Sequence, residues 1–429
     1  MSFSFLRRLR VVAILAAFLS LPAGAVEPLT LREAQSLAVG RSQQLAANNA
    51  SVTASREMAA AAGQLPDPVL KLGVDNLPVD GADRFSLSRD FMTMRRIGLS
   101  QELPGAQKRQ LRSERFDREA DRTFAEIQLN IANIERDTAL AWIERYYTQQ
   151  MRELVLRQIE ETELQARTAE SGFGVGRNSQ ADVFAARAAQ VMLEDRLSQI
   201  DKQEQNATLT LARWIGADAQ RPIAGAPAWQ TSHLDDQKLD EHIQSHPDLA
   251  MLRAQVEAAR TEAKLAQANK HADWSVEAMY SQRGSAFSNM VSIGVSIPLQ
   301  WDQKNRQDRE VAAKVALVDE AQAKYEDMVR RHDAEIRSLL NDWNNGKARV
   351  ARLRTQLIPL ATQRVQASLT AYRTGKADLA STLLARRDEV DARMQALTVE
   401  METALAWARL DFLIPNPDSH MPAHSQEQP

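Results

Sequence analysis

The sequence has no cysteine among its 429 residues. Structural disulfides, thiolate metal sites and cysteine nucleophiles are therefore excluded, as is N-terminal lipidation, which needs a cysteine at the processing site. Glycine and proline are scarce, with 16 and 15 residues. Because these two residue types end helices, their scarcity over long stretches favours unusually long helices.

Long apolar runs are also missing. No stretch reaches the roughly 18 consecutive apolar residues that a membrane-spanning helix needs. Residues 1–25 are typical of a cleaved export signal, with arginines at 7, 8 and 10, an apolar run at 11–21, and Ala23-Gly24-Ala25 before the cleavage point. An uncleaved anchor is the alternative. Removing three arginines makes the formal charge of −3 more negative, which argues against nucleic-acid partners.

Catalytic motifs are absent as well. The sequence contains neither Gly-x-Ser-x-Gly nor His-Glu-x-x-His, and a helix rather than a strand precedes the glycines at 172, 174 and 176, unlike a nucleotide-binding loop. His242 and His246 have helical spacing, but Pro247 follows and no carboxylate motif accompanies them. We therefore expect no enzyme, no cofactor and no metal site. A weak contact of the tail residues His420, Met421 and His424 with a soft metal stays open.

The sequence repeats itself once. Ile97-Gly98-Leu99-Ser100 recurs as Ile293-Gly294-Val295-Ser296, and each copy leads to a proline and a long charged run. Further on, residues 174–177 correspond to residues 373–376. We predict two structural repeats, at 26–228 and 229–415, and a C-terminal tail at 416–429.

Each repeat is expected to contain two very long helices. The stretch 106–171 has neither glycine nor proline, and about 66 helical residues extend ~100 Å. A seam with alternating spacings of 3 and 4 runs from Val315 to Trp343, which is typical of a left-handed coiled coil. Helices of this length must pack along one another. We predict them at residues 106–171, 177–215, 302–373 and 376–414.

Four segments alternate apolar and polar residues, as β-strands with one apolar face do. They are expected at about 69–77, 92–102, 274–282 and 290–299. Such strands are typical of a transmembrane barrel, although a small half-buried soluble sheet gives the same pattern. Because four strands cannot close a barrel and an open edge is not tolerated in lipid, three copies with twelve strands are expected.

Several motifs resemble the TolC family of outer-membrane efflux channels. They are the opening 29–34, the strand-to-helix passage 97–109, Phe173–Gly176 followed by Asp182-Val183, and Tyr372–Gly375 followed by Leu383-Leu384. The resemblance implies an α+β membrane protein: a homotrimer in outer-membrane lipid with a 12-stranded barrel and long α-helical hairpins forming an α-barrel. It also implies a periplasmic adaptor protein and an inner-membrane pump of the RND type as partners.

The stretch 100–109 is similar to the heavy-metal branch, the CzcC/CusC-like proteins, which implies export of heavy-metal cations. Drug efflux and type I protein secretion stay open within the family. A periplasmic coiled-coil adaptor or scaffold with a soluble sheet is the alternative from a different class.

The two turns are the candidate functional site. Gly176 and Gly375 are each expected to close a helical hairpin in the left-handed conformation. In the family such tips, here including Gly174, form the periplasmic gate where the adaptor docks. We predict that an Asp182–Tyr372 hydrogen bond holds the gate closed; alternatively, Asp182 supports the start of its own helix.

Asp378 follows the second turn. In a trimer it could form a ring of three carboxylates that favours cations. The alternative is an exposed first-turn aspartate that complements the helix dipole.

Overall fold

The structure is a computed structural model that describes residues 27–176, 178–232 and 239–413. The predicted export signal and the tail with His420 and His424 lie outside these residues. The described residues divide into two compact units: those within 27–41, 134–231 and 342–409 form unit 1, and those within 42–133, 232–341 and 410–413 form unit 2. Each unit draws on both predicted repeats, so the compact units are not the repeats.

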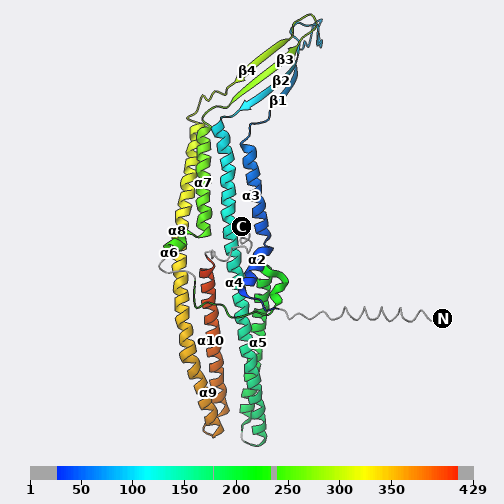
Figure 1. Cartoon of the computed structure of the whole chain (residues 1–429). Coiled ribbons are helices and arrows are strands. Elements are labelled where there is room, and N and C mark those ends of the chain that lie inside the picture. The colour runs from blue at the N-terminus through cyan, green and yellow to red at the C-terminus, as the bar shows by residue number, and fades with distance from the viewer. Residues whose placement is uncertain (1–26, 177, 233–238, 414–429) are drawn as a thin grey trace, which may run out of the picture. The chain divides into compact units, whose positions relative to one another are not determined.

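The same order of elements runs twice, a helical segment, two strands and two long helical segments (Figure 1). The first half has α2 (Leu31–Arg41), α3 (Gln43–Ala62), β1 (Val69–Asp75), β2 (Met94–Leu103), α4 (Ala106–Gly174), α5 (Gln180–Ile215) and η1 (Gly216–Gln220). The second has α6 (Leu239–Gln244), α7 (Pro247–Ala268), β3 (Trp274–Gln282), β4 (Met290–Ser296), α8 (Gln307–Arg352), a π-helical segment η3 (Leu353–Leu357), α9 (Ile358–Arg373) and α10 (Leu379–Asp411). Long helices and four antiparallel strands confirm the predicted fold class. Among the described helices, none is long and apolar enough to cross a membrane.

In unit 1, one tryptophan of each half hydrogen-bonds to the backbone near the start of that half. The indole N–H of Trp142 in α4 donates to the carbonyl of Leu29 at 3.1 Å, and that of Trp343 in α8 donates to the carbonyl of Trp229 at 2.7 Å. Both tryptophans are buried. A buried indole needs such an acceptor, so the duplication extends from the sequence to equivalent buried hydrogen bonds.

The predicted helix at 302–373 is not regular throughout. It starts at Gln307, and residues 353–357 widen into a π-helical turn before α9. Pro359 explains the position of this turn, because proline lacks an N–H group and its ring clashes with the carbonyl four residues earlier. Gly346 has a different role: a Cβ there would lie 2.3 Å from Thr403 Oγ1, so glycine allows α10 to approach closely.

In unit 2 the passage from β2 to α4 is fixed by a buried lysine. Lys108 is 6% exposed. It forms an ion pair with Asp273 at 2.8 Å and also donates to the carbonyl of His271, just before β3. In the same passage the amide of Gln101 donates to the carbonyl of Pro66 at 2.7 Å. The stretch at 100–109 therefore connects the ends of strands from both halves.

The four strands form one antiparallel sheet in the order β1-β2-β3-β4 (Figure 1). Its register places apolar residues opposite one another across all strands: Leu70 pairs with Leu99, Leu99 with Ala278, and Ala278 with Ile293. The other face is polar and carries an ion pair between Lys71 and Glu277 at 2.7 Å.

Within the described residues, no helix or loop covers the apolar face of the sheet. Ile293 is 83% exposed and Leu72 is 70% exposed, and the large apolar residues of all four strands share this exposure. A half-buried soluble sheet would cover this face with helices or loops. The structure therefore leaves a continuous apolar surface, which in a folded protein marks contact with lipid or with another protein.

Candidate functional site

The first hairpin tip lies between α4 and α5 in unit 1. Helix α4 continues three residues beyond its predicted end, to Gly174, and α5 begins at Gln180 after the N-cap Ser179. Gly176 has φ = +75°, which confirms the predicted left-handed conformation. Gly174 is the last residue of α4, with open space where a Cβ would lie.

The second tip lies between α9 and α10. Helix α9 ends at Arg373 as predicted, and Gly375 has φ = +69°. Helix α10 begins at Leu379, three residues later than predicted, because Asp378 caps its N-terminus. The carboxylate of Asp378 accepts a hydrogen bond from the backbone N–H of Ser381 at 2.9 Å.

The two tips use the same capping pair in reversed order. At the first tip Ser179 is the cap and Asp182 is the third helical residue, whereas at the second tip Asp378 is the cap and Ser381 is the third. Asp182 accepts from the backbone N–H of Ser179 at 2.9 Å and from its hydroxyl at 2.7 Å, which completes a capping box. Both arrangements satisfy backbone groups at a helix start.

The predicted Asp182–Tyr372 hydrogen bond is not formed within the chain. The carboxylate of Asp182 is engaged by Ser179, which bears out the alternative that it supports its own helix. The hydroxyl of Tyr372 donates instead to Oδ1 of Asn178 at 2.8 Å. Within one chain, Tyr372 therefore lies at the first tip but bonds to Asn178 rather than to Asp182.

Asn178 was not among the predicted site residues, because nothing in the sequence distinguishes it from other turn residues. Its side-chain amide also donates to the carbonyl of Ala169 at 3.2 Å. A Cβ on Gly172 would lie 2.5 Å from Nδ2 of Asn178, so glycine makes room for this side chain. Tyr372 also packs on a small apolar cluster under the tips, formed by Ala166, Ala169, Val183, Ala186 and Leu379.

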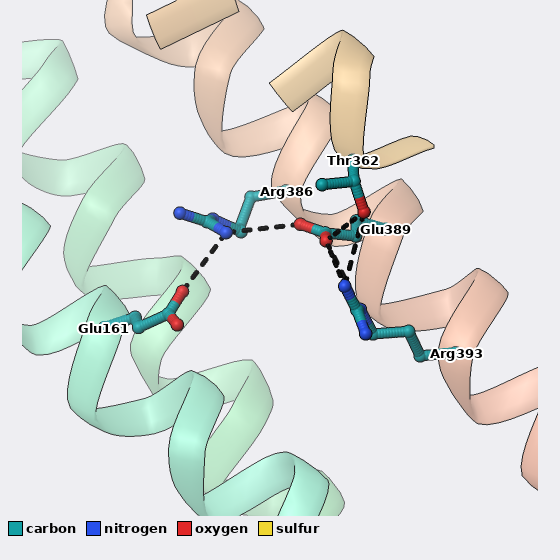
Figure 2. Close-up of polar contacts among 5 residues, drawn as sticks. All are labelled: Glu161, Thr362, Arg386, Glu389 and Arg393. Carbon is teal, nitrogen blue, oxygen red and sulfur yellow. Dashed lines mark hydrogen bonds and ion pairs between the residues drawn. The ribbon is translucent and has the colours of Figure 1, made fainter. Parts of the chain in front are cut away.

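Further from the tips, a buried carboxylate joins α10 to α9 (Figure 2). Glu389 is 4% exposed. It accepts hydrogen bonds from Thr362 at 2.8 Å and Arg393 at 2.8 Å, and it pairs with Arg386 at 3.2 Å. Arg386 also reaches Glu161 on α4 at 3.2 Å. One arginine therefore bridges a helix of the first hairpin and a helix of the second.

The electrostatics of Glu389 are set by two opposing effects. Burial alone raises the pKa of the Glu389 carboxyl, but hydrogen bonds from Arg393 and Thr362 and the charges of Arg393 and Arg386 outweigh it. The pKa therefore lies below the ordinary value of 4.5. The pKa of Asp378 is also lowered, mainly by the hydrogen bond from the backbone of Ser381.

A groove of about 500 Å³ lies beside this network, between α4, α5 and α10. Its floor is apolar, with Met192, Leu193, Leu383, Leu384 and Val390 among its residues. Arg196 and Asp391 form an ion pair at 2.6 Å that crosses it from α5 to α10.

Comparisons with known proteins agree with this architecture. Residues 239–415 match the family described as outer membrane efflux protein. The chain is 25% identical, over 406 residues, to the cobalt-zinc-cadmium resistance protein CzcC of Cupriavidus metallidurans, covering 92% of this chain and 91% of that protein.

Solved structures share the fold along most of the chain. A crystal structure of CusC superposes with a TM-score of 0.76 at 13% identity, covering 91% of this chain and 93% of that one. The CmeC outer membrane channel of Campylobacter jejuni gives 0.74 at 11% identity, covering 90% and 85%. Identities this low establish the fold alone.

Proposed function

We propose that the chain is a member of the TolC-like outer membrane efflux protein family and that three copies of it form the exit channel of a tripartite efflux system. The family consists of channels rather than enzymes. The proposed role is passive: the trimer conducts cargo from the periplasm to the exterior, and an inner-membrane pump of the RND type supplies the energy.

The observation that carries this proposal is the uncovered apolar face of the sheet. Its residues are aligned by the register and exposed in every strand, up to 83% at Ile293. Lipid is a suitable neighbour for such a face, and the polar face with Lys71 and Glu277 is suited to a water-filled lumen.

The edges of the sheet support a trimer. Among the described strands of one chain, β1 and β4 each pair on one side only. An unpaired edge cannot stay in lipid because its N–H and C=O groups lack partners. Pairing β4 of one copy with β1 of the next satisfies both edges, and three copies then give a closed barrel of twelve strands.

The hairpin tips are proposed as the periplasmic gate and docking region for the adaptor. The residues involved are Gly174, Gly176, Asp182, Tyr372, Gly375 and Asp378. The groove between α4, α5 and α10 supports this assignment, because an adaptor helix with an apolar stripe fits its apolar floor. Three copies of Asp378 would add a ring of negative charge at the mouth, since the lowered pKa keeps the carboxyl ionised at neutral pH.

Heavy-metal cations are the proposed cargo. The support is the likeness to CzcC, which is described as a cobalt-zinc-cadmium resistance protein, together with the carboxylate at position 378. Drug efflux is the second candidate, because the resemblance to the TolC family leaves the cargo open.

A strain that lacks the gene tests both the proposed channel function and the proposed metal cargo. Loss of the gene should lower tolerance to cobalt, zinc, cadmium, copper or silver, and the unaltered gene should restore it. Lowered tolerance to drugs alone would reject the metal cargo and keep the channel. Recovery of the protein in the soluble periplasmic fraction, as a monomer before boiling, would reject the channel in favour of a periplasmic scaffold.

A further inference from the structure

Two histidines and an aspartate meet in unit 2 where α7 begins beside α8. His246, Asp248 and His332 each offer one ligand atom, and these atoms all lie within 4.8 Å of one another. His246 is 4% exposed and His332 is 6% exposed. Buried imidazoles that face a carboxylate are a common arrangement for transition-metal ligands.

Helix geometry brings the three side chains together. His246 is the N-cap of α7, Pro247 is its first residue, and Asp248 follows in the first turn. His332 is a polar member of the seam of α8, and its Nε2 lies 3.2 Å from Oδ2 of Asp248. The two imidazole rings are 4.0 Å apart between centroids.

We propose that His246, Asp248 and His332 bind a divalent transition-metal ion of the zinc class, with water as a fourth ligand. Two imidazoles and one carboxylate are a typical zinc set, with bonds of about 2.0–2.2 Å. Tetrahedral ligands at that bond length are separated by roughly 3.3–3.5 Å. The distance of 3.2 Å between His332 and Asp248 is close to this separation.

The ring nitrogen of His332 that does not face Asp248 also has surroundings typical of a metal-bound histidine. Its Nδ1 is buried without a hydrogen-bond partner within the described structure and lies 3.7 Å from Oε2 of Glu335. Metal-bound histidines usually direct the second ring nitrogen to a carboxylate, which fixes the tautomer. In the proposed metal-bound state, Glu335 would accept from Nδ1 and orient His332 from outside the ligand set. The neighbouring cation, Arg331, has its own partner in Asp327 at 3.7 Å.

Binding requires one rearrangement at His246. Its Nδ1 accepts a hydrogen bond from the backbone N–H of Asp248 at 3.0 Å, as a helix cap. Coordination through Nδ1 replaces that bond, and coordination through Nε2 moves the ring proton to Nδ1 and also ends it. The metal therefore competes with the cap of α7, which makes an asparagine at this position informative: it can cap the helix without supplying an imidazole.

The site could not be inferred from spacing in the sequence. In the sequence, His246 stands out only for its helical spacing from His242. The proposed site instead combines His246 with Asp248 and with His332, which lies 84 residues beyond Asp248. Only the packing of α7 on α8 brings them together. The metal would join the N-terminus of α7 to the middle of α8. The proposal does not depend on the cargo of the channel.

The test uses the full-length protein without a histidine tag, in a background carrying His420→Gln and His424→Gln so that the tail cannot bind metal. Zn²⁺ binding is measured by calorimetry and Co²⁺ binding by its visible absorption bands. The variants are His246→Asn, His332→Gln and Glu335→Gln. His271→Gln serves as a matched control because His271 is an exposed histidine of the same unit.

The background protein and His271→Gln should bind one Zn²⁺ per chain and give tetrahedral Co²⁺ bands. His246→Asn and His332→Gln should lose this binding, and Glu335→Gln should weaken it roughly 10- to 100-fold. Thermal unfolding of each variant without metal shows whether it is folded. If His332→Gln does not fold, the test rests on His246→Asn, in which the asparagine still caps α7. No binding in the background protein, or equal binding in both ligand variants and the control, would overturn the site.

Discussion

The hydroxyl of Tyr372 donates a hydrogen bond to Oδ1 of Asn178 at 2.8 Å, and this bond joins the tips of the two helical hairpins of unit 1. Asn178 is itself held by the carbonyl of Ala169 at 3.2 Å. Separating the tips within one chain therefore requires breaking the Tyr372–Asn178 bond. In the proposed channel this bond takes the role that Asp182–Tyr372 was expected to have.

Tyr372→Phe removes the donor of this bond and keeps the ring that packs under the tips. We expect higher single-channel conductance or more frequent opening of the trimer in planar bilayers. Tyr325→Phe is the matched control, because Tyr325 lies in unit 2 outside the tips and its hydroxyl donates to Gln244. Equal conductance of Tyr372→Phe and the unaltered protein would exclude this bond as a gate.

The two turn glycines should be sensitive to a side chain. Gly176→Ala and Gly375→Ala place an alanine at φ of +75° and +69°, where an L-residue costs about 1–2 kcal/mol. Each should lower the melting temperature of the purified protein. Gly174→Ala should not, since Gly174 ends α4 with open space around it and alanine favours the helix. A melting temperature lowered equally by all three would contradict the turn geometry.

Stability should depend on the charge of Glu389. Its pKa is lower in the folded protein than the ordinary value of 4.5, so the unfolded chain binds more protons in this range. The stabilisation is fully present above the ordinary pKa and is lost as pH falls through the folded pKa. Melting temperatures measured from pH 6 to pH 3 should therefore fall, and Glu389→Gln should flatten that dependence.

Glu389→Gln should also destabilise the protein at neutral pH, by about 1–3 kcal/mol, because Arg386 and Arg393 lose a buried anion. Glu161→Gln is the comparison, since Glu161 shares Arg386 but its side chain is 48% exposed. Its effect should stay below about 1 kcal/mol. Identical pH profiles for the unaltered protein and Glu389→Gln would show that another carboxyl governs acid stability.

Much of this fold could be predicted from residue patterns. The stretch without glycine or proline at 106–171 predicts most of the length of α4, which ends at Gly174, and left-handed glycines at 176 and 375 set the turns. Alternation in the strands predicted the face on which Leu72 and Ile293 lie. These features are local, so each follows from a few neighbouring residues.

The remaining features depend on packing between distant segments. Asn178 finds its partner 194 residues away, and Glu389 finds Thr362 on the preceding helix. No spacing rule specifies such pairs. The π-helical turn before Pro359 also could not be predicted, because the sequence locates a proline but does not show how the helix adapts to it.

Lys108 should be essential for the stability of unit 2. Lys108→Met leaves Asp273 with only the more distant Arg112, at 3.6 Å, and should cost roughly 2–4 kcal/mol. Asp273→Asn alone should be similarly harmful, and the double variant should recover part of the loss. Chemical denaturation in detergent measures all three. Additive losses in the double variant would show that the ion pair contributes nothing.

The central claim, that the apolar face of the sheet contacts lipid, is tested most directly by cysteine labelling, because the chain has no native cysteine. Ile293→Cys places a thiol on the apolar face of β4, and Ser292→Cys places one on the opposite face. In intact outer membranes, position 292 should react with a charged water-soluble thiol reagent, and position 293 should be protected and quenched by lipid-attached probes. Equal reaction of both positions with the aqueous reagent would contradict the account.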